Sequence, residues 1–196
     1  MTAALDTYLN RLPAGLESYP NMTIKGAIFR QFLKGVDVDL LRAALPPRLL
    51  SLVDNPPPAN VWMPEVQSNA VFTVVAEVCF ADEDAFMQYA YENNKEVLES
   101  PLYALLIRML SPSRVVKLAA KAWGQMHKGT TLFADDHGAY TLLRLDHPPH
   151  AYPRCMLLAL SQGYLSAAHL AGEEAATAEL IDEEVDGAAF KLNWNG

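Results

Sequence analysis

Apolar positions recur at helical spacing in the first two thirds of the chain. Val71, Val74, Val75 and Val78 follow one another at i, i+3, i+4 and i+7. This spacing places four side chains on one face of a helix, and it outweighs the strand propensity of valine. Asp82 is a suitable N-cap for the next helix. The pattern therefore predicts a buried helix, followed by an amphipathic helix that presents Phe86 and Tyr89 inward and charged side chains to water.

The remaining N-terminal elements are also expected to be helical. The spacing predicts one helix over residues 22–36 and a short second one over 39–45, which the pair Pro46-Pro47 ends. The proline-rich stretch 54–60 is expected to be a loop, because proline lacks the backbone donor that a regular element needs. Two Ser-Pro pairs are typical of helix starts and predict helices at about 101–110 and 112–127.

The pattern changes to strands after Gly129. A hairpin is predicted with its turn at Gly138, and a second one around Asp186-Gly187, with a long helix over 153–170 between them. The predicted fold class is α+β, with N-terminal helices followed by β-β-α-β-β and an antiparallel sheet covered by helices. We expect a single domain over 1–196, in which 1–21 is an N-terminal extension or helix, 22–128 is mainly helical, and 129–194 holds the sheet and the long helix.

Composition narrows the range of functions. Of the 196 residues, 51% are hydrophobic and only 19% are charged, which favours an apolar cavity or an exposed partner face. The formal net charge of -8 argues against nucleic acid, whose binding relies on clustered Lys and Arg. No apolar run is long enough to span a membrane, and the first residues do not resemble a secretion signal, so a cytoplasmic location is expected.

Aromatic and methionine side chains supply a candidate ligand pocket between the helices and the sheet. The same residues would equally suit an ordinary filled core, and both interpretations stay open. The predicted pocket residues are Phe29, Phe72, Phe86, Tyr89, Tyr103, Leu106, Met109, Trp123, Met126 and Tyr164.

Candidate chemistry is sparse elsewhere in the sequence. His147, His150 and Cys155 form the densest group of metal-capable side chains, but their spacing matches no strong zinc pattern and a solvated turn is the favoured interpretation. No nucleophile elbow, phosphate-binding loop, dinucleotide fingerprint or zinc-protease helix is present. We therefore predict no catalytic residues, no metal site and no enzymatic activity.

Several short motifs carry a family resemblance. They are Ile24-Lys-Gly-Ala-Ile-Phe-Arg30, Ala44-Leu-Pro-Pro47, Leu110-Ser-Pro-Ser-Arg114, Trp123 and Phe190-Lys-Leu-Asn-Trp194. Over about residues 22–194 the chain resembles DUF2378, a myxobacterial paralogue family of unknown function. That family is similar in turn to haem nitric-oxide sensors, vinyl-reductase-type sensor domains and TRAPP trafficking subunits, which implies an α/β ligand-binding fold.

The resemblance also implies cofactor sites that this chain retains only in part. Haem sensors of the group ligate iron through a histidine in the helix before the sheet and hold the propionates with a Tyr-x-Ser-x-Arg strand. Here that helix contains no histidine, His127 lies just past its end, and Tyr140 and Arg144 flank Leu142 in place of serine. No cofactor is predicted, with haem kept as a disfavoured alternative.

Zinc is disfavoured on similar grounds. Vinyl-reductase-type sensors hold zinc with three cysteines and one glutamate, of which only Cys155 and Glu179 are retained at matching places. Asp182 and Ala188 stand where the other two thiolates would be.

Three functions remain as hypotheses. The first is a non-enzymatic sensory or regulatory domain that binds a small apolar or aromatic ligand in an internal pocket. The alternative is a protein-interaction or scaffold subunit with a filled core, and an enzyme acting on a hydrophobic substrate is a third, less favoured option. A homodimer and a separate downstream protein are the expected partners, with no nucleic acid and no membrane span.

Overall fold

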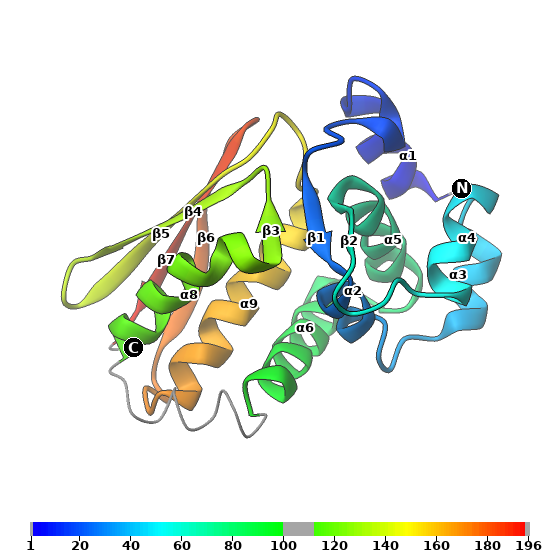
Figure 1. Ribbon diagram of the computed structural model, residues 1–196. Coiled ribbons are helices and arrows are strands. Elements are labelled where there is room, and N and C mark those ends of the chain that lie inside the picture. The colour runs from blue at the N-terminus through cyan, green and yellow to red at the C-terminus, as the bar shows by residue number, and fades with distance from the viewer. Residues whose placement is uncertain (1, 100–111, 195–196) are drawn as a thin grey trace.

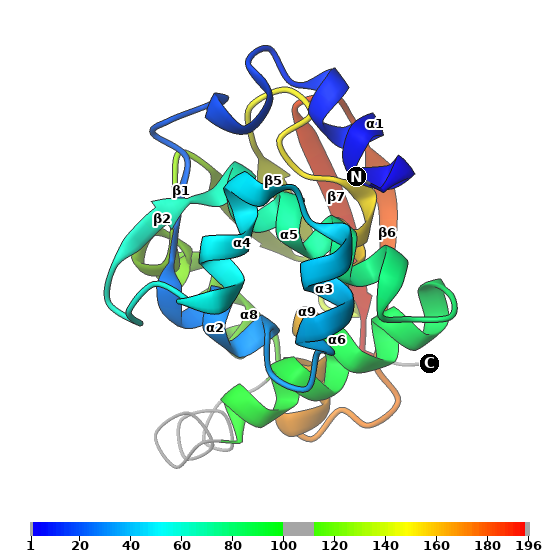
Figure 2. The ribbon, with the colours of Figure 1, turned by 90° about the vertical axis from the view of Figure 1, so that its right-hand side faces the viewer.

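The computed structural model describes residues 2–99 and 112–194, which form a helical half and a sheet half (Figure 1). In the helical half, α1 (Ala3–Arg11) and the short 3-10 helix η1 (Gly15–Glu17) precede α2 (Gly26–Phe32). The other helices there are α3 (Val38–Ala44), α4 (Pro47–Asp54), α5 (Glu65–Val78) and α6 (Glu83–Leu98). When the helical half faces the viewer, α3 and α4 lie in front of α5 (Figure 2).

The sheet half contains one antiparallel sheet of four strands in the order β4-β5-β7-β6. The strands are β4 (Thr131–Asp136), β5 (Tyr140–Asp146), β6 (Thr177–Glu183) and β7 (Gly187–Asn193). Two helices, α8 (Pro112–Met126) and α9 (Arg154–Leu170), lie across one face (Figure 1). The predicted α+β class and the β-β-α-β-β order are therefore confirmed.

Side chains alternate along these strands between a covered and an open face. Thr141, Leu143 and Leu145 of β5 are buried toward the helices, and Phe190 of β7 packs edge-on against Tyr164 of α9 with ring centroids 5.3 Å apart. The other face of the sheet is exposed, as is usual for an antiparallel sheet packed on one side.

A small second sheet joins the two halves. Its three short strands are β1 (Thr23–Lys25), β2 (Trp62–Pro64) and β3 (His127–Lys128), in the order β2-β1-β3. Ile24 pairs with Met63 on one side and with His127 on the other. The end of α8 is thereby held beside the start of α5, far from it in sequence.

The small sheet overturns the prediction of one helix over 22–36. Residues 23–25 pair with β2, and Thr23 and Ile24 also pair with β3, so the helix begins only at Gly26. Distant strands decide the conformation of this segment. A side chain at Gly26 is excluded, since its Cβ would lie 2.3 Å from the carbonyl oxygen of Pro58. The expected loop at 54–60 passes closely over the start of α2.

The helix α4 was also missed at the sequence level. Pro46-Pro47 does end the preceding helix, but Pro47 occupies the first turn of α4, where the missing N–H costs nothing. By contrast, the predicted cap of α6 is confirmed, because the Asp82 carboxylate accepts a hydrogen bond from the Ala85 N–H at 2.8 Å. The helix expected at 101–110 lies outside the described residues.

Candidate functional site

Three of the predicted pocket residues lie in the core of the helical half. Phe29, Phe72 and Phe86 are fully buried. The ring of Phe72 lies 5.4 Å from that of Phe29 and 4.5 Å from that of Phe32, centroid to centroid. These aromatic side chains fill the space between α2, α5 and α6 with one another.

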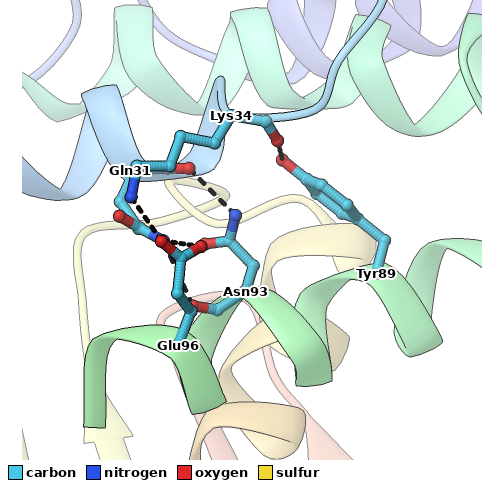
Figure 3. A network of polar contacts seen from close by, with 5 residues as sticks. All are labelled: Gln31, Lys34, Tyr89, Asn93 and Glu96. Atoms are coloured by element: carbon cyan, nitrogen blue, oxygen red, sulfur yellow. Dashed lines mark hydrogen bonds and ion pairs between the residues drawn. The ribbon is translucent and has the colours of Figure 1, made fainter. Parts of the chain in front are cut away.

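Tyr89 joins the same cluster, but its hydroxyl points to the end of α2 (Figure 3). The hydroxyl donates to the carbonyl of Phe32, and the ring lies edge-on to Phe32 at 5.9 Å. Beside it, the Asn93 amide donates to the carbonyl of Gln31 at 2.9 Å, and Lys34 pairs with Glu96 at 2.6 Å. Tyr89 therefore anchors α6 to α2, and burial raises its pKa.

The other predicted pocket residues are spread over the sheet half. Trp123 is buried against His127, Tyr164 faces Phe190, and Met126 is exposed. Tyr103, Leu106 and Met109 lie outside the described residues. An internal pocket enclosed by the whole set therefore stays a prediction.

A cleft of about 640 Å³ opens where α1, α5 and the start of α9 meet. Tyr8 and Tyr152 line it with buried rings, and the hydroxyl of Tyr8 donates to the carbonyl of Ala151 at 2.8 Å. Among the predicted pocket residues that the structure describes, only Phe86 lines this cleft. The apolar side chains along its wall are Ala3, Ala4, Tyr8, Ala76, Phe80, Ala81, Phe86, Tyr152 and Pro153.

The rim of the cleft is charged. Arg154 pairs with Glu183 at 3.1 Å and with Glu83 at 3.6 Å, so it closes one side. Glu77 accepts a hydrogen bond from the backbone N–H of Ala4 at 3.0 Å, which ties α1 to α5. Acidic side chains outnumber basic ones around this rim.

A buried polar junction lies behind the cleft. Glu65, at the first position of α5, is fully buried, and its Oε1 atom accepts hydrogen bonds from the hydroxyl of Tyr152 and from Nδ1 of His127, the latter at 2.8 Å. The His127 ring stacks on Trp123 of α8, with centroids 3.8 Å apart and planes 5° from parallel. Three elements that are distant in sequence therefore converge on one carboxylate.

Burial of this junction carries a cost. Within the described chain, Glu65 Oε2, Ser68 Oγ, Asn69 Oδ1 and His147 Nε2 are buried without a hydrogen-bond partner. Unpartnered buried polar atoms are unfavourable, and each costs on the order of 1–3 kcal/mol. Burial, together with the neighbouring Glu65 carboxylate, raises the pKa of Tyr152 well above its usual value.

Sequence reasoning missed Glu65 and its partners. A weak signal was present, because α5 buries nearly every residue from Glu65 to Val75 and a lone carboxylate at the start of such a helix needs a partner. The partner itself could not be read from the pattern, since His127 and Tyr152 come from separate elements.

The weak metal candidates do not converge. His147 is buried, and its Nδ1 lies 2.9 Å from the carbonyl oxygen of Pro148. Cys155 borders the cleft near Thr73, and burial raises the pKa of its thiol to about 11, which keeps it a protonated, unreactive group. Among residues 2–99 and 112–194, no three His, Cys, Asp or Glu side chains are grouped so as to hold a metal ion.

Comparison with known proteins identifies the fold. No family model matches the chain, and no curated protein matches it either. A structure from a study of haem distortion in the H-NOX family matches with a TM-score of 0.60 at 11% identity, covering 87% of this chain and 93% of that one. The chain has the H-NOX fold.

Two further structures agree. A mutant of T. tengcongensis H-NOX has a TM-score of 0.55 at 12% identity over 87% of this chain and 97% of its own. A Cs H-NOX with 4-cyano-L-phenylalanine at site 5 has a TM-score of 0.55 at 13% identity, with 87% and 96% covered. The predicted likeness to haem nitric-oxide sensors is confirmed for the fold, and that to DUF2378 stays a prediction.

The residues of this chain do not fit haem held in the way that the resemblance implies. The buried neighbours Thr141 and Leu143 place Tyr140 and Arg144 on the open face of the sheet, away from α8 and α9. There the Arg144 guanidinium pairs with Asp146 at 3.1 Å, and Tyr140 stacks on His137 at 4.7 Å. The helix α8 also contains no histidine, so it offers no axial ligand for a haem iron.

None of the described helices has the length and apolar character needed to cross a membrane.

Proposed function

We propose that this chain is a non-enzymatic sensory domain that binds a small aromatic or apolar molecule without haem. The observation that carries the proposal is the cleft of about 640 Å³ between α1, α5 and α9, within a fold that the chain shares with H-NOX domains. Small-molecule sites commonly have volumes of roughly 300–1,000 Å³ and mostly apolar walls with a few polar groups.

The cleft suits an aromatic body with a neutral or cationic end. The aromatic side chains of Tyr8, Phe80 and Tyr152 offer flat apolar surface. The excess of carboxylates at the rim favours a cation over an anion. We therefore expect affinity to fall from an aromatic amine to its neutral parent and further to the matching acid.

The same cleft borders the buried polar junction. Tyr152 lines the cleft with its ring and donates its hydroxyl hydrogen to Glu65, which in turn bonds His127. A ligand that displaces the Tyr152 ring would alter this hydrogen bond. Occupancy is thereby coupled to the end of α8, where the His127 ring stacks on Trp123.

The test compares tryptamine, indole and indole-3-acetate by thermal unfolding. A ligand that binds only the folded protein raises its Tm with concentration, and we expect the rise to follow that order. Ala81→Trp, at the exposed rim, should block it, whereas the exposed Ala43→Trp on α3 should not. Equal shifts in both variants would show binding elsewhere, and no shift with any compound would refute an aromatic-ligand sensor.

A second candidate is an interaction subunit without a small ligand. It is favoured by the mutual packing of Phe29, Phe32 and Phe72, which leaves the helical half with a filled core. A flat Tm across the compound series, together with specific binding of a protein partner, would select it.

A further inference from the structure

Charge is segregated along this chain. Residues 112–134 contain four basic residues in total, one arginine and three lysines, and no carboxylate. The whole chain, by contrast, has a formal net charge of -8. The segment covers α8, β3 and the start of β4. Such an asymmetry points to an interaction surface.

The cations of α8 lie on one stripe. Arg114, Lys117 and Lys121 are exposed, and their spacing at i, i+3 and i+7 places them opposite the buried Val116 and Trp123. Lys117 pairs with Asp136 at 3.1 Å, whereas Arg114 and Lys121 form no ion pair with any described residue. Within residues 2–99 and 112–194, two cations on this stripe therefore have no acidic partner.

An apolar side chain borders the stripe. Leu118 is 46% exposed, and it lies four residues after Arg114 and three before Lys121, so it neighbours both on the helix surface. The outer face of α8 thus combines positive charge with one exposed apolar side chain at the edge of the stripe.

Two further cations lie in the small sheet, whose strand β3 directly follows α8. The ammonium groups of Lys25 and Lys128 each lie 4.2 Å from the ring centroid of Trp62 in the small sheet. These cation–π contacts hold two long side chains in place without neutralising their charges.

The inner face of the same helix contacts the buried junction. Trp123 stacks on His127, and its indole N–H donates to the hydroxyl of Thr130 at 2.9 Å. A change at the Glu65–His127 pair therefore reaches the helix whose outer face is basic. α8 connects the interior of the molecule to this surface.

We propose that the outer face of α8 docks an acidic polypeptide segment of a partner protein, with an apolar side chain of that segment on Leu118. The proposal rests on the proposed function only in treating the docked chain as the receiver of the signal. Charge complementarity selects an acidic occupant. An extended polyanion such as nucleic acid or an anionic membrane would meet the acidic remainder of the surface, whereas a short peptide covers the width of one helix.

The test measures binding of a fluorescein-labelled peptide of repeated Glu-Glu-Leu-Ala units by fluorescence anisotropy, without any cleft ligand. We expect saturable binding that weakens as salt rises. Arg114→Glu with Lys121→Glu should weaken it at least about tenfold at low salt. Arg11→Glu with Lys95→Glu, which changes the net charge equally on α1 and α6, should leave it nearly unchanged.

A second matched pair of variants tests the apolar contact. Leu118→Ala should weaken peptide binding about threefold to tenfold, and Leu40→Ala on α3 should not, although both leucines are 46% exposed. These variants change exposed side chains, so both proteins are expected to remain folded.

Several outcomes would overturn the proposal. Absence of peptide binding, or equal loss in the α8 pair and the control pair, excludes this face as an acidic-peptide site. Tighter binding of an oligothymidylate or of phosphatidylserine vesicles assigns the face to another class of anion, and salt-sensitive self-association in sedimentation assigns it to a second copy. A peptide that binds while tryptamine does not would retain the docking surface and reject the ligand sensor.

Discussion

The aromatic core of the helical half and the polar junction behind the cleft are both fully buried, but they are built differently. Phe29, Phe32 and Phe72 contact one another through rings, and this packing needs no partner of defined direction. Glu65 depends on two donors, His127 and Tyr152, each of which must arrive at one oxygen atom. The first region stabilises the fold without a directional requirement, whereas the second requires a defined geometry, because hydrogen bonds weaken steeply when donor and acceptor are displaced.

The largest expected effect lies in the aromatic core. Phe72→Ala removes a fully buried ring that contacts two others, and we expect it to lower the free energy of unfolding by about 3–5 kcal/mol. Urea denaturation measures the change. Phe133→Ala, at a position 41% exposed on the sheet, serves as control and should cost less than about 1 kcal/mol. Similar losses at both positions would contradict the assignment of this core.

A smaller effect with strong coupling is expected at the junction. Glu65→Gln keeps the shape but removes the charge from two hydrogen bonds, which should cost about 1.5–3 kcal/mol. His127→Phe keeps an aromatic ring for Trp123 to stack on, while it removes the donor. In a double-mutant cycle the two changes should be non-additive by about 0.5–3 kcal/mol. Strict additivity would show that the two side chains do not share an interaction.

The smallest expected effect is a pH dependence of the free energy of unfolding. It arises beside the polar junction and not in the aromatic core. Burial lowers the pKa of His147 below its usual 6.5, despite the nearby Asp186 and Asp146 carboxylates. As pH falls below 6.5, the unfolded chain binds the proton and the folded protein does not, so stability is lost as pH approaches the lower, folded-state pKa. His147→Asn should remove up to about 1.4 kcal/mol per pH unit of that slope.

The matched control for this titration is His137→Asn, since His137 is exposed on Tyr140. Denaturation curves at several pH values between neutral and mildly acidic provide the slopes. The prediction fails if His137→Asn flattens the profile as much as His147→Asn does.

Much of the fold could be predicted from local pattern. The valine period marked α5, Asp82 marked the start of α6, and the two hairpins followed from Gly138 and Asp186-Gly187. These signals are local because a helix face or a tight turn is specified by a few consecutive residues. The segments β1, β2 and β3 escaped because each is at most three residues long and exists only by pairing with distant strands.

The candidate site was predicted only in part. The sequence marked Phe86 and Tyr89 as inward-facing, but it could not show that Phe86 borders a cleft while Tyr89 anchors the end of α2. The sequence also did not indicate Glu65, because the role of this side chain depends on hydrogen-bond donors from other elements. Spacing along one helix defines a face, whereas a site is defined by what the facing elements contribute.

The sequence by itself determined the α+β class, the order of helices and hairpins, and the exclusion of the common catalytic motifs. Periodicity and turn chemistry act over a few consecutive residues, so both can be recognised in the sequence alone. Only the tertiary structure decided that Tyr140 and Arg144 lie on the open face of the sheet, that Glu65 meets His127 and Tyr152, and that the cations of α8 face outward. Those outcomes depend on strand register and on the packing of elements far apart in sequence, because the free energy of burial is decided by the whole assembled core.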